Sequence, residues 1–387
     1  MDEHRVASRL QGIPPTIFTE MSALAASTGA VNLGQGFPDT DGPADVIEAA
    51  RSALASGANQ YAPGPGLPAL RAAIAAHQDR CYGLAWDPAA EVVVTTGATE
   101  AIAGALLGLV EPGDEVVLLE PYYDSYVAML QMAGGVRRPV TLRAPSFRLD
   151  VAELRAAVTP RTRFLLVNTP HNPTGTVLTP AELHAIAEVA VEHDLTVITD
   201  EVYEHLTFGV PHVPLATLPG MRERTLTISS IGKSYSLTGW KVGWAVGPAH
   251  LVGAVLAAKQ WLTFTSGAPL QPAAAYALTQ APDWPAALAN ELRERRDQLC
   301  AGLADAGLPA SVPDGTYFAL TDISHLGWPD GMSFCRALPA RAGVVAIPVQ
   351  GFYDTGAGQQ LVRWAFCKRP EVLAEAVSRL RAADLAP

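Results

Sequence analysis

The chain has 387 residues, 49% of them hydrophobic, and a formal net charge of −11 at pH 7. This length exceeds a single ordinary core and predicts one large domain with a smaller one, and the hydrophobic content excludes a disordered chain. The acidic balance, with Arg and Lys scattered along the chain, argues against a nucleic-acid partner.

Three local features concern the compartment. The four cysteines lie far apart with no CxxC pair, which is typical of reduced thiols and not of a disulfide framework. Residues 1–5 contain early acids and no apolar segment of a secretory signal. The best uninterrupted apolar run, residues 101–110, is too short to cross a bilayer. We therefore expect a cytoplasmic protein with no membrane partner.

The predicted elements alternate along the chain. Residues 1–40 are expected to be irregular, because Pro and Gly pairs interrupt them. After them, short apolar runs predict strands at 92–96, 116–119, 164–167, 196–199 and 225–228, with helices at 98–110 and 180–193. This order predicts an α/β fold with a mostly parallel central sheet flanked by helices.

The last third of the chain predicts a second unit. The long charged segment 288–303 reads as a connecting helix, and strands are expected at 344–347 and 361–366. We therefore predict an N-terminal arm at 1–40 that belongs partly to the small domain, a large domain at 41–285 and a smaller α+β domain at 286–387. Polar residues follow the strand ends, which is where open α/β sheets bind ligands.

The loop Ser229-Ser230-Ile231-Gly232-Lys233 follows the strand at 225–228. The amine of Lys233 could hold an aldehyde cofactor and then move a proton, which typically contributes roughly 10²–10⁴-fold to a rate. A surface lysine is the ordinary interpretation of an isolated Gly-Lys pair. The catalytic interpretation depends on the other motifs that accompany it.

Asp200 ends an apolar strand, an unusual place for an acid without a partner. A carboxylate there could pair with a protonated ring nitrogen, although a turn or cap role is the ordinary alternative. Tyr203 could donate to a ring phenolate. Asn168 and Asn172 follow the preceding strand, and Asn172 suits both a cofactor oxygen and a substrate carboxylate. Between them, His171 is assigned a structural or cofactor-edge role.

Anion sites are predicted at two places. Gly97-Ala98-Thr99 opens the helix after the strand at 92–96, where free N–H groups suit a phosphate, and Ser230 and Lys241 could complete that site. Arg363, within an apolar run, matches a substrate α-carboxylate, although an exposed edge-strand arginine is equally compatible. Tyr122 or Tyr123 could stack on a cofactor ring.

An amine for an aldehyde, a carboxylate for a ring nitrogen and donors for a phosphate together predict a pyridoxal 5'-phosphate (PLP) site. Other cofactors leave no signature here. The histidine spacings do not match a zinc set, HExxH is absent, and we predict no metal. The chain also lacks a GxGxxG fingerprint and a Walker loop.

The chain resembles the class I and II PLP-dependent aminotransferases of fold type I over almost its whole length. It is most similar to the kynurenine/glutamine transaminases and the N-succinyldiaminopimelate aminotransferases. The motifs that carry the resemblance stand in the family order: Asn32-Leu33-Gly34-Gln35-Gly36-Phe37-Pro38, Asn59-Gln60-Tyr61, Gly97-Ala98-Thr99-Glu100, Glu120-Pro121-Tyr122-Tyr123-Asp124, His171-Asn172-Pro173-Thr174-Gly175, Asp200-Glu201-Val202-Tyr203, Ser230-Ile231-Gly232-Lys233 and Arg363.

The resemblance implies a role for each matching residue. Lys233 matches the lysine that binds the cofactor aldehyde, and Asp200 matches the partner of the pyridine nitrogen. The implied contacts to the cofactor oxygen O3′ and phosphate come from Tyr203, Asn172, Ala98, Thr99, Ser230 and Lys241. Tyr123 takes the ring-stacking position, where relatives often have Phe, and His171 stands where many have Asn. The implied substrate site contains Gly36, Asn172 and Arg363, with Phe18 and Phe264 at aromatic specificity positions.

Tyr61 matches a tyrosine that reaches the neighbouring subunit's phosphate site, which implies a homodimer with shared active sites. The implied activity is ping-pong transfer of an amino group from an L-amino acid to a 2-oxo acid, of the kynurenine, glutamine or methionine type or of the N-succinyldiaminopimelate type. A β-lyase for cysteine S-conjugates is the alternative within PLP chemistry. A non-catalytic regulator is disfavoured because no basic DNA-binding segment precedes residue 40.

Overall fold

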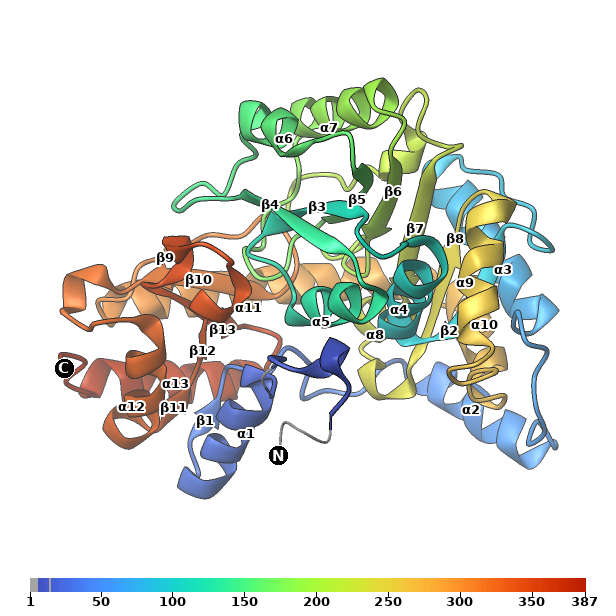
Figure 1. Ribbon diagram of the computed structural model, residues 1–387. Helices are drawn as coiled ribbons and strands as arrows, with labels where there is room; N and C mark the ends of the chain where they lie inside the picture. The colour runs from blue at the N-terminus through green and yellow to red at the C-terminus, as the bar shows by residue number, and fades with distance from the viewer. Residues whose placement is uncertain (1–5, 14) are drawn as a thin grey trace.

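A seven-stranded sheet forms the centre of the computed structural model, which describes residues 6–13 and 15–387 (Figure 1). The strand order is β2-β8-β7-β6-β5-β3-β4. All neighbours are parallel except β8, which runs antiparallel to β2 and β7. The strands are β2 (Val92–Thr96), β3 (Glu115–Glu120), β4 (Val136–Thr141), β5 (Thr162–Asn168), β6 (Thr196–Asp200), β7 (Thr225–Ser230) and β8 (Val242–Val246). The predicted mostly parallel sheet is confirmed.

Helices cover both faces of this sheet, because its strands are apolar on both sides. One face packs against α4 (Gly97–Leu109), α5 (Asp124–Ala133) and α9 (Ala249–Lys259), and the other against α6 (Val151–Ala157) and α7 (Pro180–Glu192). At the β2 end lie α2 (Ala44–Ala55), α3 (Pro68–Tyr82) and α10 (Leu270–Gln280). Helix α7 begins with a capping box between Thr179 and Glu182, which satisfies its first free N–H groups.

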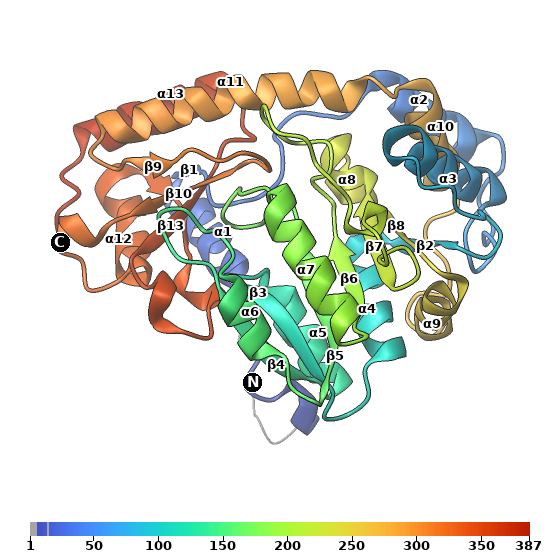
Figure 2. The ribbon, with the colours of Figure 1, turned by 90° about the horizontal axis from the view of Figure 1, so that it is seen from above.

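The long helix α11 (Trp284–Asp305) runs from the α10 side of the molecule to its C-terminal part (Figure 2). There β9 (Ala310–Ser311), β10 (Phe318–Asp322), β12 (Ile347–Pro348) and β13 (Leu361–Ala365) form an antiparallel sheet beside α12 (Gly331–Ala342) and α13 (Pro370–Ala382). Strand β1 (Val31–Asn32) pairs in parallel with β11 (Val344–Val345). The start of the chain therefore lies against its last third. The domain boundaries at 40 and 285 stay a prediction.

Several sequence predictions differ from the structure. Residues 1–40 are not irregular throughout: α1 (Ile17–Thr28) forms there, because Met21 and Ala25 bury one face and Gly29 ends the helix in the left-handed conformation. The strand predicted at 344–347 divides at Ala346, since β11 pairs with β1 and β12 pairs with β13. Residues 1–5, on which the prediction of no secretory signal depends, lie outside the described residues. Within the described residues, no helix is long and apolar enough to cross a membrane.

Candidate active site

The carboxyl ends of β5, β6 and β7 place polar side chains next to one another. Asn168 ends β5 directly beside Asp200, which ends β6, and its Nδ2 donates to the Asp200 carbonyl at 2.8 Å. Ser230 ends β7 and begins the short helix α8 (Ile231–Ser234), which carries Lys233. These residues meet at one edge of the sheet because β5, β6 and β7 are adjacent and parallel.

Lys233 is mostly enclosed, and its Nζ lies 3.0 Å from the Tyr317 hydroxyl and 3.4 Å from the Gly36 carbonyl. The Tyr317 hydroxyl itself donates to the Gly36 carbonyl at 2.6 Å. Burial lowers the pKa of Lys233 to about 8, although Asp200 opposes this shift. At neutral pH this amine is therefore neutral far more often than an exposed lysine, which is what a nucleophile requires.

Asp200 is only 6% exposed, and burial raises the pKa of its carboxyl. Its Oδ2 accepts from the Tyr126 hydroxyl at 2.6 Å, and its Oδ1 accepts from the Val202 N–H at 3.3 Å. Among the described residues no cationic side chain forms a salt bridge with it. A buried carboxylate without a cation is suited to a positively charged ligand group.

Arg363 lies on β13 at 1% exposure, and burial lowers the pKa of its guanidinium to about 10. Its Nη1 donates to Asn172 Oδ1 and its Nη2 to the Gly34 carbonyl, both at 2.9 Å. Asn172 is held in turn through its N–H, which donates to Asn168 Oδ1 at 2.8 Å. No carboxylate of the described chain pairs with this guanidinium, and its Nε has no partner. The exposed edge-strand interpretation of Arg363 is thus wrong.

Aromatic rings surround the Arg363 guanidinium. The ring centroids of Phe318, Phe18 and Phe352 lie 4.0, 4.9 and 5.9 Å from it. Phe18 also contacts Tyr123, whose ring centroid is 6.4 Å away. Burial raises the pKa of Tyr123 to about 12, and Asp200 is one of the charges that act on it. The structure therefore brings Phe18 and Tyr123 to the site that contains Arg363.

The residues of the predicted anion site lie at the amino end of α4. Gly97 has a φ of +72°, and a Cβ there would lie 3.1 Å from Nζ of Lys241. This Nζ also donates to the Thr99 hydroxyl at 3.3 Å. On β8, Gly243 lets the strand approach closely, since its Cβ would lie 2.6 Å from the backbone N of Ala98. A glycine-lined helix start with an adjacent ammonium group is suited to a phosphate.

Tyr61 and Phe264 lie apart from the residues around Arg363. Tyr61 is 84% exposed and Phe264 is 49% exposed, and their rings meet edge to face at 5.4 Å. Phe264 also has a φ of +64°, an uncommon conformation for a bulky residue. Next to it, Thr263 donates to Glu100 of α4 at 2.5 Å. The Thr263–Glu100 hydrogen bond thus holds this exposed aromatic pair beside the amino end of α4. In a single chain, neither ring of the pair contacts Phe18, Phe318 or Phe352 around Arg363.

Sequence reasoning missed two tyrosines and left one histidine open. Tyr126 stands one helical turn after Tyr123 on α5, which is the signal that could have found it. Tyr317 precedes β10 and has no local motif. His171 is fully buried, and its Nδ1 lies 2.7 Å from the Thr174 hydroxyl. Burial lowers the pKa of His171 to about 4, so the ring is neutral at neutral pH, and its structural or cofactor-edge role stays a prediction.

Comparison with known proteins shows which family this chain belongs to. The sequence profile of the family described as aminotransferase class I and II matches residues 28–380. The chain belongs to this family. It is a PLP-dependent aminotransferase, as the sequence motifs predict.

This aminotransferase has close relatives of known name. It is 55% identical to the probable N-succinyldiaminopimelate aminotransferase of Mycobacterium tuberculosis, over 96% of this chain and 97% of that protein. It is 42% identical to the methionine aminotransferase of Escherichia coli, over 97% of each chain. The solved structure of the N-succinyldiaminopimelate aminotransferase from M. tuberculosis superposes with a TM-score of 0.96 at 55% identity, over 98% of this chain and 100% of that one.

The residues present fit the cofactor of this family. Three features of the site suit groups of this cofactor: the Asp200 carboxylate without a salt-bridge partner, the glycine-lined start of α4 and the enclosed Lys233 amine. A pyridinium nitrogen, a phosphate and an aldehyde are the matching groups. PLP carries all three.

Proposed function

We propose that this aminotransferase takes its amino group from an extended L-amino acid of the N-succinyldiaminopimelate type and delivers it to a 2-oxo acid in two half-reactions. The buried Arg363 guanidinium, with no carboxylate partner in the described chain, is the observation that carries the proposal of an α-carboxylate substrate. The 55% identity over nearly the whole chain supports the choice of donor. The alternatives, a β-lyase and a non-catalytic regulator, are not favoured, since the compared relatives are named aminotransferases.

The proposed cofactor contacts follow from the site. When bound, PLP supplies an electron-withdrawing ring that stabilises negative charge at the substrate Cα. Asp200, positioned by Tyr126 and the Val202 N–H, would keep the ring nitrogen protonated. The proposed contacts to O3′, to the phosphate and to the ring face come from Tyr203, Asn172, Gly97, Ala98, Thr99, Ser230, Lys241 and Tyr123, with Asn168 positioning Asn172.

Lys233 is proposed to act twice. Its Nζ would hold the cofactor aldehyde, and the free Lys233 amine would accept the proton from the substrate Cα. Burial lowers the pKa of Lys233 to about 8, which brings it close to the range where a general base is effective at neutral pH. The Tyr317 hydroxyl, 3.0 Å from Nζ, keeps the freed amine near the reaction centre.

The donor preference is tested with a panel of amino donors against 2-oxoglutarate and pyruvate. We expect N-succinyl-L,L-diaminopimelate to give the highest kcat/KM. Methionine and kynurenine form the second candidate, because the stacked rings of Phe18 and Phe352, 5.8 Å apart, provide an apolar wall. The choice of the succinylated donor would be wrong if methionine or kynurenine gave a higher kcat/KM. The aromatic pocket would then determine the donor specificity.

Replacing Arg363 should weaken substrate binding selectively. Hydrogen bonds to charged groups contribute about 1.5–3 kcal/mol each, so losing two of them in Arg363→Met is expected to lower kcat/KM for amino acids by roughly 10²–10⁴-fold, mainly through KM. Arg363→Lys should recover little, because an ammonium cannot form two parallel bonds with a carboxylate. The matched measurement uses the corresponding amine without a carboxylate, whose kcat/KM should hardly change. An equal loss for amine and amino acid would contradict this role.

We also propose a homodimer in which Tyr61 reaches the phosphate site of the partner, with Phe264 beside it toward the substrate. The support is the exposure of both rings and their position beside α4. A reducing compartment such as the cytoplasm fits the four unpaired cysteines.

Shared sites predict complementation between two defective variants. Lys233→Ala and Tyr61→Ala subunits are each expected to be impaired, but a mixed dimer contains one site with both side chains intact. Subunit exchange should therefore raise activity well above that of either variant alone. Exchange that is verified by mass spectrometry and yields no added activity would mean that Tyr61 serves its own subunit.

A further inference from the structure

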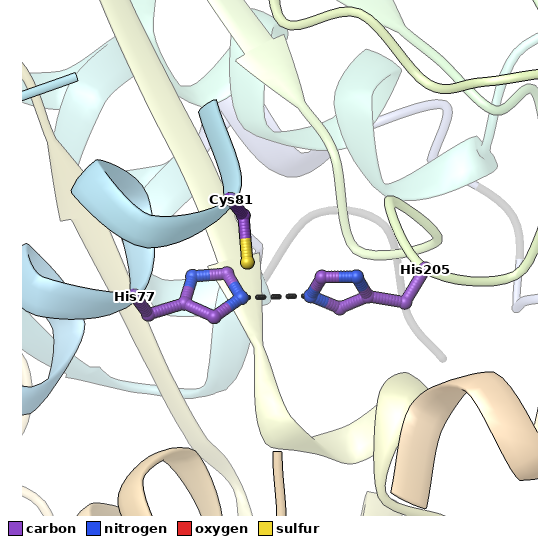
Figure 3. A group of neighbouring side chains, drawn as sticks. All are labelled: His77, Cys81 and His205. Atoms are coloured by element: carbon purple, nitrogen blue, oxygen red, sulfur yellow. Dashed lines mark hydrogen bonds between the residues drawn. The ribbon is translucent and has the colours of Figure 1, made fainter. Parts of the chain in front are cut away.

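Two histidines and a cysteine outside the proposed cofactor site point toward one another (Figure 3). His77 and Cys81 stand one turn apart on the same face of α3, and His205 lies in the turn that follows β6. Nε2 of His77 and Nε2 of His205 are 2.7 Å apart. The donor atoms of all three side chains lie within 4.8 Å of one another, the one such group among the described residues. We propose that these three side chains bind one Zn²⁺ ion.

The donor set and its geometry suit zinc. Two imidazole nitrogens and one thiolate are typical zinc ligands, and tetrahedral coordination separates such donors by about 3.3–3.6 Å. The two histidine nitrogens, 2.7 Å apart, are thus about half an ångström too close, and all three donor atoms lie within 4.8 Å of one another. Small rotations of these side chains, including that of the exposed Cys81, would bring the three donors to zinc-binding distance. The contact between two Nε2 atoms also requires a lone pair on one of them, so a metal-binding electron pair already points into the group.

Charge near the group favours a divalent cation. Glu204 lies beside His205, with Oε2 3.9 Å from the His205 Nε2. The carboxylate is buried and held by the Tyr82 hydroxyl at 2.6 Å and the Ser229 hydroxyl at 2.5 Å. One thiolate and this nearby fixed carboxylate together balance the two charges of the ion.

A hydrogen-bonded packing contact is the ordinary alternative. His77 is 2% exposed, and its Nδ1 is a buried atom with no partner among the described residues. Because zinc would bind His77 through Nε2, the Nδ1 atom is equally unpartnered with and without the ion. The two interpretations are therefore separated by zinc titration of the parent and of Cys81→Ser. Sequence spacing does not reveal this group, because only the fold brings His77 and Cys81 of α3 next to His205, which lies 128 residues after His77 along the chain.

The bound ion would fasten α3 to the turn that carries Tyr203, two residues before His205. We therefore expect zinc to stabilise the folded enzyme, since a ligand that binds only the native state raises the melting temperature with its concentration. The proposal does not depend on the donor specificity of the enzyme.

The test uses the holoenzyme, treated with EDTA and dialysed, and titrated with ZnCl₂ by calorimetry. We expect one ion per chain, at least about tenfold weaker binding in Cys81→Ser, and a rise in melting temperature in the parent alone. Co²⁺ replaces Zn²⁺ as a spectroscopic probe and should give a near-ultraviolet thiolate band that Cys81→Ser lacks. Cys81→His should restore zinc binding without that band.

The controls separate this site from other metal binding. Cys81→Ser keeps the PLP site, so any ion held by the cofactor appears equally in parent and variant. His250→Gln removes an exposed histidine on α9 and should bind zinc as the parent does. Equal zinc affinity in the parent and in Cys81→Ser, or less than one ion per chain in the parent, would overturn the proposal.

Discussion

Lys233→Ala is expected to lower kcat by at least 10²–10⁴-fold, the range of a positioned proton-transfer group, and to remove the visible absorption band of the bound cofactor. The reason is that the variant lacks the amine that we propose both to bind the aldehyde and to take the Cα proton. The measurement combines steady-state kinetics with the absorption spectrum of the purified protein.

Lys233→Arg is the matched control for this change. It keeps a positive charge at a site where the parent amine, with its pKa lowered to about 8 by burial, is often neutral. An arginine stays protonated and can neither bind an aldehyde nor accept a proton. We expect Lys233→Arg to be as inactive as Lys233→Ala. Substantial activity in the arginine variant would show that charge alone is needed there, and the role assigned to Lys233 would fail.

Asp200→Asn is expected to lower kcat by about 10²–10³-fold with little loss of folding stability. Two unit charges about 4 Å apart interact by about 4 kcal/mol at an effective dielectric constant of 20, and each 1.36 kcal/mol is a factor of ten in rate. Asparagine keeps an acceptor for the Val202 N–H, so the turn after β6 should persist. The measurement is kcat together with the melting temperature of the cofactor-loaded enzyme.

Tyr126→Phe is the graded control for Asp200. It removes the 2.6 Å hydrogen bond to Oδ2 but keeps the carboxylate charge, so we expect a loss of about tenfold. The order of effects should be Asp200→Asn, then Tyr126→Phe. If Asp200→Asn stays within a few-fold of the parent, the carboxylate serves only the turn, which is the ordinary interpretation of an acid at a strand end.

The sequence identified the central sheet and the polar residues at its edge, because each buried parallel strand is a continuous apolar run that ends in a polar side chain. Asn168, Asp200 and Lys233 follow three such runs, and adjacent strands bring them together. Strand β4 is harder to recognise, since this edge strand contains two arginines and a proline and is partly exposed. Helix α1 is hard to predict from the sequence, because the Pro and Gly residues that flank it favour an irregular segment.

The rest of the site depends on contacts between distant segments, which no local pattern records. Tyr317 reaches Lys233 from the other part of the molecule, and Arg363 reaches Asn172 across 191 residues of sequence. The burial of Arg363 likewise follows from the packing of three phenylalanine rings that lie far apart in the chain. For the same reason the group formed by His77, Cys81 and His205 is invisible to spacing rules.

The most direct test of the whole account is reduction of the native enzyme with borohydride, followed by peptide mass spectrometry. We predict that the peptide containing Lys233 gains the mass of one reduced pyridoxyl phosphate group and that the other lysine peptides do not. An unmodified Lys233 peptide, or the added mass on Lys241 instead, would contradict the assignment on which the proposed chemistry depends.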